Sequence, residues 1–398
     1  MNILFSTGHP AQIHNFRVVR EVLKKHGHHV YWLATQKDIS DYLLNAYCIK
    51  YTKLKRPQKG MLSKAITLLQ NAWITAKIIH RNKIDIVVSR VNPGVVLAAY
   101  LMRKKQIALS DTEAAGIYES VFSKLVGAFI TSKSYERTLR KDQIRIEANI
   151  ELFYLHKKYF KPNRREVYQL LGISGGTAFV IARFVSGTAF HDAGHKSFAE
   201  ENKVKLVKVI SPHAKIFISS EGEMSDELKP YQIKIPYEKM HDVLSEATLF
   251  FGEGASMASE AAMLGTPAVY VNDLWAGDTN DETRAGLMYS YKIDEESQTE
   301  SIGKAVELLK NPQLKAETKQ KQQEFLETKI DPVAFLTWFI ENYPESKKIM
   351  IDNPDYQYRF GSPSAKAVPL TGGVFCDKQH SPTDNRQGMT GALGFFRG

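Results

Sequence analysis

Residues Thr248 to Asn272 read TLFFGEGASMASEAAMLGTPAVYVN, and their pattern gives the strongest indication of the fold. The apolar residues from Thr248 to Phe251 predict a short strand, and the small residues after them predict a turn. A helix is expected through Leu264, where Gly265 ends it, and Ala268 to Val271 predicts a second strand. The stretch is therefore predicted to be a strand, helix, strand unit of an α/β protein.

The turn from Gly252 to Ser256 suits a phosphate group. Glycine lets the backbone approach a ligand, and the next helix begins with free N–H groups and the positive end of its dipole. Glu260 lies about one helical turn beyond Ser256, so its carboxylate could reach the sugar hydroxyls of a nucleotide. Small residues in such a turn often only pack a helix on a sheet. Spacing alone leaves both interpretations open, because neither G-x-G-x-x-G nor G-x-x-x-x-G-K-[ST] is present.

The run GEGASMASEAAMLGTPAV resembles a segment of the sugar-nucleotide-binding domain in proteins of the GT-B fold. It is most similar to UDP-N-acetylglucosamine 2-epimerases and to an uncharacterised GT-B-like family found with polysaccharide genes. The resemblance implies that Gly254, Ala255 and Ser256 hold a diphosphate and that Glu260 binds the ribose. It also implies an α/β fold of two doubly wound Rossmann-like domains facing across a cleft. The expected substrate is a nucleoside-diphosphate sugar, a UDP-sugar by resemblance, with no permanently bound cofactor.

At 398 residues, 43% of them hydrophobic, the chain is long enough for two domains. We predict an acceptor-side Rossmann-like domain over residues 1–170. A sugar-nucleotide-binding Rossmann-like domain is predicted over 171–345, with its last helix returning across the cleft. We interpret residues 351–398 as a disordered tail, because Gly, Pro, Ser and Thr are frequent from residue 361 and no periodicity is sustained. The Gly361-Ser362 pair is typical of a segment added to a native chain.

Composition also bears on location and partners. We recognise no membrane span, no signal peptide and no disulfide framework, so a cytoplasmic protein is expected. Residues 1–170 hold 29 Lys and Arg against 12 Asp and Glu, whereas the remainder holds 24 against 31. This asymmetry predicts an anionic partner, and a lipid-linked diphosphate or a membrane fits better than nucleic acid, for which no recognition motif is present.

A long amphipathic helix is expected between residues 53 and 83. It combines Leu62, Ile66, Leu69 and Trp73 with basic flanking residues. Such a helix can lie on an anionic membrane, here the inner face of the plasma membrane, although most helices of this kind only pack on their own domain. Peripheral membrane binding is therefore one of two hypotheses for this segment.

A second predicted ligand corner follows the first strand, Met1 to Ser6. The segment TGHPAQIHNF, from Thr7 to Phe16, resembles the glycine and histidine loop of GT-B transferases, which faces the cleft. By this resemblance His14 or His9 is the cleft histidine. An imidazole titrates near neutral pH, so it could deprotonate an acceptor hydroxyl. The alternative is that both histidines only cap the turn or the helix.

Polar residues follow two successive predicted strands, with Arg90 and Asn92 after one and Asp111 and Glu113 after the next. Carboxyl ends of parallel strands bind ligands, so these residues are expected to share the cleft with His14. The segment from Glu113 to Gly116 resembles the E-A-G segment of the 2-epimerases. However, the chain carries arginine at position 90, in a turn where those enzymes have an acidic residue.

Arg183 ends the first predicted strand of the second domain, where a guanidinium can bind two diphosphate oxygens at once. The loop pattern of His191, Asp192 and His195 is weak evidence for a metal, and no bound metal is expected. Asn272 to Glu282 is interpreted as a flexible loop. Its Asp278, Asn280 and Glu282 could hold sugar hydroxyls, although solvent-facing charge is the simpler interpretation for any one of them.

Three functions remain open. The leading hypothesis is a glycosyltransferase of surface polysaccharide or glycolipid assembly, in which Arg183 and the turn before Glu260 hold the donor and His14 activates the acceptor. The second is a non-hydrolysing sugar-nucleotide 2-epimerase that uses Asp111, Glu113 and His191. The third is a non-catalytic protein that binds a sugar nucleotide or a glycan. The missing acidic residue and the basic N-terminal half favour the transferase.

Overall fold

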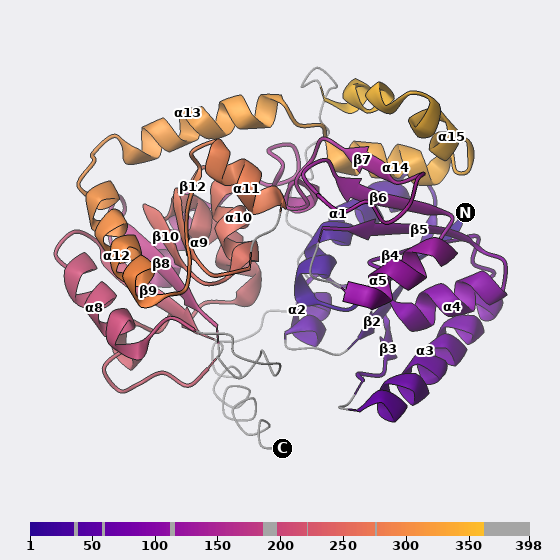
Figure 1. The fold of residues 1–398 in the computed structure, drawn as a ribbon, viewed down its shortest axis with the longest axis horizontal. Helices are drawn as coiled ribbons and strands as arrows, with labels where there is room; N and C mark the ends of the chain where they lie inside the picture. The colour runs from indigo at the N-terminus through magenta and orange to yellow at the C-terminus, as the bar shows by residue number, and fades with distance from the viewer. Residues whose placement is uncertain are drawn as a thin grey trace.

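The protein is built from two parallel β-sheets with helices on both faces (Figure 1). The computed structural model describes residues 1–35, 39–57, 60–111, 116–185, 197–220, 222–274 and 277–361, without the side chains of 116–118. All strand pairings between neighbours in both sheets are parallel. The predicted doubly wound α/β fold is confirmed.

The first sheet has seven strands in the order β3-β2-β1-β4-β5-β6-β7. Alternation in β1 separates its two faces: Ile3 and Phe5 pack with α1, whereas Leu4 packs with residues of α3 and α4. The strands are β1 (Asn2–Thr7), β2 (His29–Thr35), β3 (Thr52–Leu54), β4 (Ile86–Ser89), β5 (Lys105–Ser110), β6 (Ala128–Ser132) and β7 (Ile144–Ile146). The helices in this part of the chain are α1 (Pro10–Lys25), α2 (Ser40–Ala46), α3 (Met61–Arg81), α4 (Pro93–Leu101), α5 (Gly116–Phe122), α6 (Leu152–Leu155) and α7 (Arg164–Leu171), with the 3-10 turn η2 (Ser123–Leu125).

The second sheet has five strands in the order β12-β11-β10-β8-β9. Its central strand β10 is fully buried, with α8 and α12 on one face and α9 and α10 on the other. The strands are β8 (Phe179–Phe184), β9 (Lys215–Ser220), β10 (Leu249–Gly252), β11 (Ala268–Val271) and β12 (Met288–Tyr291). The helices are α8 (Glu200–Ile210), α9 (Met240–Glu246), α10 (Ala255–Met263), α11 (Gly277–Arg284), α12 (Glu295–Leu309) and α13 (Leu314–Glu327), with the 3-10 turns η3 (Lys229–Tyr231) and η4 (Tyr237–Lys239).

Residues 248–272 form the predicted strand, helix, strand unit. Strand β10, helix α10 and strand β11 follow one another, and β10 pairs with β11 in parallel. Gly265 takes a positive φ of 74° directly after the helix, a conformation in which glycine is favoured. The unit therefore occupies the centre of the second sheet and presents the start of α10 at the carboxyl end of β10.

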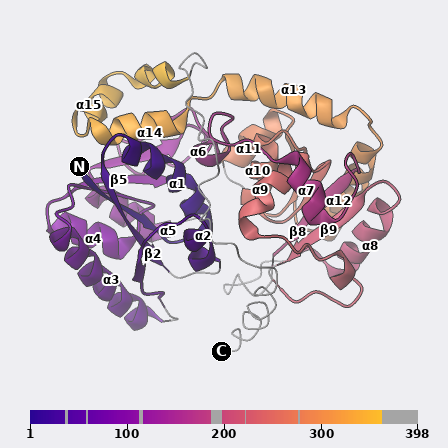
Figure 2. The ribbon, with the colours of Figure 1, turned by 180° about the vertical axis from the view of Figure 1, so that it is seen from behind.

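The chain ends its described part on the opposite half of the molecule (Figure 2). After α13, helices α14 (Pro332–Glu341) and α15 (Glu345–Asp352) lie over the seven-stranded sheet, where α14 packs on α1 and α6. The predicted start of disorder at residue 351 is wrong for residues 351–361. They complete α15 and the 3-10 segment η5 (Pro354–Phe360), because buried Gln357 accepts a hydrogen bond from the Glu147 backbone N–H at 2.6 Å. Residues 362–398 lie outside the described part, and the division at residues 170 and 345 stays a prediction.

Candidate functional site

Arg183 and the glycine turn lie side by side at the carboxyl edge of the second sheet. Gly252 of β10 pairs in register with Arg183 of β8. A Cβ at Gly252 would collide with the carbonyl oxygen of Arg183, so only glycine fits there. A Cβ at Gly254 would come within 3.3 Å of the Arg183 Cγ. The guanidinium donates a hydrogen bond to the Ser219 hydroxyl at 2.8 Å, so two groups predicted to hold a diphosphate share one corner.

The N-cap residue of α10 is Gly254, which has no side chain to accept hydrogen bonds from the first N–H groups of the helix. Ala255 is half-buried and Ser256 is exposed at the first turn. Backbone N–H groups at a helix start favour an anion, so this corner could accept a phosphate.

Glu253, between the two glycines, has a structural role that the sequence analysis missed. Its side chain is buried, and its carboxylate accepts hydrogen bonds from the backbone N–H groups of Val185 at 3.1 Å and Phe198 at 2.7 Å. Residues 186–196, which include His191, Asp192 and His195, lie between these two anchors and outside the described residues. Glu253 therefore holds the backbone at Val185 and at Phe198 beside the glycine turn.

Glu260 is buried at the boundary between the two halves of the molecule. Its Oε1 accepts a hydrogen bond from the Tyr154 hydroxyl at 2.7 Å and lies 3.0 Å from His241 Nε2. Tyr154 belongs to α6, which packs on α1, whereas His241 belongs to α9 of the second half. The predicted ribose ligand is thus engaged by residues from both halves.

His14 reaches the same place from α1. Its ring centroid lies 4.7 Å from that of His241 and 5.3 Å from that of Tyr154, and its Nδ1 is 3.3 Å from the Tyr47 hydroxyl. We call these residues the His–Tyr cluster: His14, Tyr47, Tyr154, His241 and Glu260. Burial, followed by the charge of His241, lowers the pKa of His14 well below its usual value. The His14 imidazole is therefore neutral at neutral pH.

His9 has the simpler of its two predicted roles. It is the N-cap residue of α1, and its Nδ1 accepts a hydrogen bond from the Ala11 backbone N–H at 3.3 Å. Of the two histidines in the loop, His14 is the one whose ring lies in the His–Tyr cluster.

Asp111 lies at the end of β5 and is paired. Arg90 donates a hydrogen bond to the Asp111 carboxylate and a second one, at 3.3 Å, to Asn15 Oδ1. Only 7% of the Arg90 side chain is exposed. A charge buried to this extent needs a partner of opposite charge, and the Asp111 carboxylate is that partner. Arginine at position 90 thus binds one of the two carboxylates predicted for proton transfer. The other, Glu113, lies outside the described residues.

Three further carboxylates form a buried group that was not predicted from the sequence. We call Glu151, Asp278 and Glu282 the carboxylate cluster. Glu282 accepts hydrogen bonds from Asn149 Nδ2 at 3.0 Å and from the Ser259 hydroxyl at 2.8 Å. The Ser134 hydroxyl donates to Asp278. Because Ser259 and Glu260 are adjacent on α10, the carboxylate cluster adjoins the His–Tyr cluster.

Burial raises the pKa of all three carboxyl groups above its ordinary value. Burial and the neighbouring Asp278 raise the pKa of Glu282 to about 8, and burial raises the pKa of Asp278 to about 6. Burial and then Glu282 raise the pKa of Glu151 well above its usual value. At neutral pH the group therefore retains protons, as closely spaced carboxyl groups in a dry site do.

The interpretation of Asn272 to Glu282 as a solvent-facing loop is wrong for its second half. Residues from Gly277 to Arg284 form α11, in which Asp278 and Glu282 are buried. Their spacing of four residues puts both on one helical face. This spacing in the sequence could have indicated a helix with both carboxylates on one face. The polar composition of the segment favoured a loop instead.

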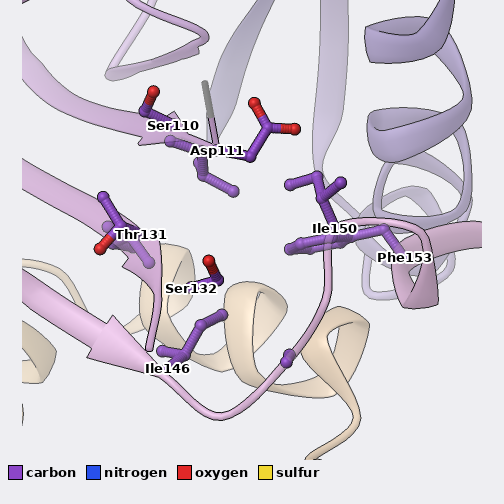
Figure 3. Close-up of a pocket in the computed structure, with 10 residues that line it drawn as sticks. Ser110, Asp111, Thr131, Ser132, Ile146, Ile150 and Phe153 are labelled. Carbon is purple, nitrogen blue, oxygen red and sulfur yellow. The ribbon is translucent and has the colours of Figure 1, made fainter. Parts of the chain in front are cut away.

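A small hollow lies at the carboxyl ends of β5, β6 and β7 (Figure 3). Its polar edge includes Ser110, Asp111 and Ser132, and its apolar wall includes Ile150 and Phe153. Ser132 is hydrogen-bonded to Ser134 at 2.8 Å, and Ser134 bonds Asp278. The strand ends of the first sheet are thus continuous with the carboxylate cluster.

Among the described residues, no group of three or more His, Cys, Asp or Glu side chains is arranged to hold a metal ion. The carboxylate cluster instead receives hydrogen bonds from Ser and Asn side chains.

Comparisons with known proteins address the fold. A scan of protein-family models and a search of curated protein sequences found no match. Among solved structures, the UDP-GlcNAc 2-epimerase from Neisseria meningitidis bound to UDP-GlcNAc aligns with a TM-score of 0.60 at 13% identity, over 88% of this chain and 99% of its own. MurG from Acinetobacter baumannii aligns with a TM-score of 0.54 at 16% identity, over 85% and 99% of the two chains. The chain has the GT-B fold.

A third GT-B neighbour widens the range of chemistry. The spinosyn rhamnosyltransferase SpnG, complexed with spinosyn aglycone, aligns with a TM-score of 0.53 at 12% identity over 86% of this chain and all of its own. Epimerases and glycosyltransferases are thus both similar to this GT-B chain over most of its length. At these sequence identities the similarity establishes the GT-B fold. It does not distinguish an epimerase from a glycosyltransferase, so the reaction must be inferred from individual residues.

Proposed function

We propose that the chain is a glycosyltransferase that moves a sugar from a nucleoside-diphosphate sugar to a hydroxyl acceptor in cell-surface polysaccharide or glycolipid assembly. The observation that carries the proposal is the position of His14. A buried imidazole with a lowered pKa lies in one cluster with Glu260, the predicted ribose ligand. A neutral histidine beside the donor site is the group that acceptor activation requires.

The donor side of the proposal rests on the corner formed by Arg183 and the start of α10. Gly254, Ala255 and Ser256 offer backbone N–H groups, and Arg183 lies beside Gly254. Both features stabilise negative charge, which increases on the diphosphate as the bond to the sugar breaks. Glu260 lies further along α10 and would bind the ribose hydroxyls once the bonds to Tyr154 and His241 open. A UDP-sugar is the donor we favour.

The acceptor side rests on the ring nitrogens of His14. If Nδ1–H donates to the Tyr47 hydroxyl, which is 3.3 Å away, then Nε2 carries the lone pair. This nitrogen would take the proton of the acceptor hydroxyl as its oxygen bonds to the sugar carbon. The nucleoside diphosphate leaves with the electron pair of the broken bond.

The paired state of Asp111 counts against epimerisation. An epimerase of the 2-epimerase type must remove a proton from the sugar and eliminate the nucleotide, for which the sequence offered Asp111 and Glu113. Arg90 holds the Asp111 carboxylate in an ion pair, so a substrate that used Asp111 as its base would have to displace this contact.

One observation favours the epimerase as the second candidate. The carboxylate cluster contains Glu282 with a pKa of about 8 and Asp278 with a pKa of about 6. Carboxyl groups tuned to this range can exchange protons at neutral pH. The 2-epimerase reaction needs such groups.

One experiment separates the candidates. The chain is incubated with UDP-, TDP- and GDP-sugars in deuterated water, with and without hydroxyl acceptors, and the products are analysed by NMR and mass spectrometry. The proposal predicts sugar transfer that depends on the acceptor and no deuterium at C2 of the sugar. Deuterium at C2 without an acceptor would establish the epimerase instead. Nucleotide binding without either reaction would favour the non-catalytic alternative.

A further inference from the structure

Helix α3 presents its apolar and polar residues in an inverted arrangement. Thr67, Asn71 and Thr75 are buried against the rest of the molecule. A set of large apolar side chains is exposed instead: Leu62 at 75%, Ile66 at 47%, Leu69 at 64% and Trp73 at 67%. Steps of four, three and four residues place this set on one side of the helix. We call it the apolar stripe of α3.

The contacts of Asn71 fix this orientation. Its side-chain amide donates to the Lys55 carbonyl at 3.0 Å and accepts from the Lys55 N–H at 2.8 Å. On the neighbouring helix, a Cβ at Gly94 would lie only 2.8 Å from the Asn71 Cβ. The helix therefore packs closely on α4 through its polar side. A rotation that buries the apolar stripe would break both contacts.

Exposed apolar side chains are concentrated on α3 and its neighbour α4. Among the described residues, 12 large hydrophobic side chains are exposed, and seven of them belong to α3 and α4: Met61, Leu62, Ile66, Leu69, Trp73, Tyr100 and Leu101. The two helices pack side by side on the outer side of the seven-stranded sheet, away from the five-stranded half (Figures 1 and 2). A concentration of this kind marks an interaction surface rather than scattered exposure.

The charge around the apolar stripe is strongly positive. Residues 51–85, which include α3 and the segments directly before and after it, contain eight Lys and Arg and a single acidic residue, Asp85. On α3 itself, Lys64, Lys77 and Arg81 are exposed. The Lys77 Nζ lies 5.5 Å from the centroid of the Trp73 ring, so a cation accompanies the indole at the surface. The partner that fits is apolar in its interior and anionic at its surface.

We propose that α3 docks this half of the protein on an anionic lipid bilayer, with the apolar stripe inserted between the head groups and the basic side chains on the phosphates. Leu62 to Trp73 spans roughly 17 Å at the rise of an α-helix, and this suits a helix lying in the plane of the interface. Indole rings favour this depth, and lysine stems extend from it to the lipid charges. Within the described residues, no helix is long and apolar enough to cross a membrane.

Docking goes beyond the proposed transferase function and does not depend on it. A protein held at a bilayer would meet a lipid-linked acceptor at high local concentration, and only this consequence rests on the proposed function. Binding to vesicles can be measured without any nucleotide or acceptor. The two proposals can therefore fail separately.

The test is flotation of the full chain with vesicles of phosphatidylglycerol and phosphatidylcholine, compared with vesicles of phosphatidylcholine alone. We expect binding to the anionic vesicles, with a blue shift of tryptophan emission. The variant Leu69→Ser/Trp73→Ser should lose binding by roughly tenfold or more, because both side chains are inserted. Its control is Ile351→Ser/Tyr358→Ser, which removes two exposed apolar side chains at the C-terminal segment and should bind like the wild type.

A second pair of variants tests the charge. Lys77→Glu/Arg81→Glu should weaken binding by roughly tenfold or more, since each basic residue near a lipid surface contributes about fivefold. Lys205→Glu/Lys208→Glu makes the same change on α8 of the other half and should have little effect. Equal binding to neutral vesicles, no binding to either vesicle, or binding unchanged in the α3 variants would overturn the proposal. A dimer in light scattering that Leu69→Ser/Trp73→Ser converts to a monomer, without vesicle binding, would assign the face to a second copy of the chain.

Discussion

The rings of His14 and His241 lie 4.7 Å apart at an interplanar angle of 83°, and they join α1 of one half to α9 of the other. Two imidazolium charges at this separation repel each other in a buried site, and this adds to the effect of burial on the pKa of His14. A contact between the halves thus keeps the proposed base neutral.

Replacement of His14 by glutamine should separate catalysis from donor binding. Without the base, the rate of sugar transfer should fall by about 10²- to 10⁴-fold. Nucleotide affinity, measured by calorimetry, should stay within about twofold, because Arg183 and the start of α10 are unchanged. A His14→Gln enzyme with wild-type turnover would remove His14 from the mechanism.

The acid limb of the pH–rate profile should respond to His241. The pKa of His14 is lowered, and a general base is active when deprotonated, so wild-type turnover should persist below pH 6.5. The variant His241→Asn removes one of the groups that lower the pKa, so its acid limb should move to higher pH. A limb that stays in place would show that His241 does not tune the active base.

The Tyr154 hydroxyl should compete with the nucleotide for Glu260. Tyr154→Phe removes the 2.7 Å hydrogen bond and leaves the carboxylate in place, so nucleotide binding should stay equal or strengthen. Glu260→Ala removes the carboxylate, and UDP binding should weaken by about tenfold. Equal affinity of Glu260→Ala and wild type in calorimetry would refute the ribose assignment.

The carboxylate cluster should make stability decrease as pH rises. The pKa of Glu282 is about 8 in the folded protein, against an ordinary value of 4.5 for a glutamate, so the folded state binds this proton more tightly than the unfolded state. Stability is therefore lost progressively between pH 4.5 and 8. Glutamine resembles the protonated acid, so Glu282→Gln should raise Tm at pH 8.5 by roughly 2–5 °C and much less at pH 5.

Calorimetric scans at both pH values provide this measurement. Glu295→Gln, at an exposed position at the start of α12, is the matched control for loss of a carboxylate. If Glu282→Gln gave the same Tm change at pH 5 and pH 8.5, Glu282 would not be the group whose proton is linked to folding.

Sequence patterns predicted the two features that meet at the carboxyl edge of the second sheet, namely the glycine turn after β10 and Arg183. The glycines after β10 predicted a close backbone approach, and Arg183 was expected at the end of the first strand of the second domain. Both features follow from local sequence and from the parallel order of a doubly wound sheet. The structure places them together, although their role in ligand binding stays a prediction.

Partners that are distant in the sequence could not be predicted in the same way. Tyr154 and Glu260 are separated by 106 residues, and Tyr154 lies on a helix of four residues whose periodicity is too short to recognise. Glu151 is the residue directly before that helix. Pairing between the halves of a protein depends on tertiary packing, so the His–Tyr and carboxylate clusters became visible only in the structure.

We propose that the start of α10 holds the diphosphate of a sugar nucleotide. Titration calorimetry with UDP and UDP-sugars tests this proposal when the wild type is compared with Ser256→Asp. Ser256 is exposed, so the substitution should preserve the fold while it places a negative charge at the phosphate position. We expect the wild type to bind the nucleotide and Ser256→Asp to bind it at least tenfold more weakly. Equal binding by both proteins, or no binding of any nucleoside diphosphate by the wild type, would contradict it.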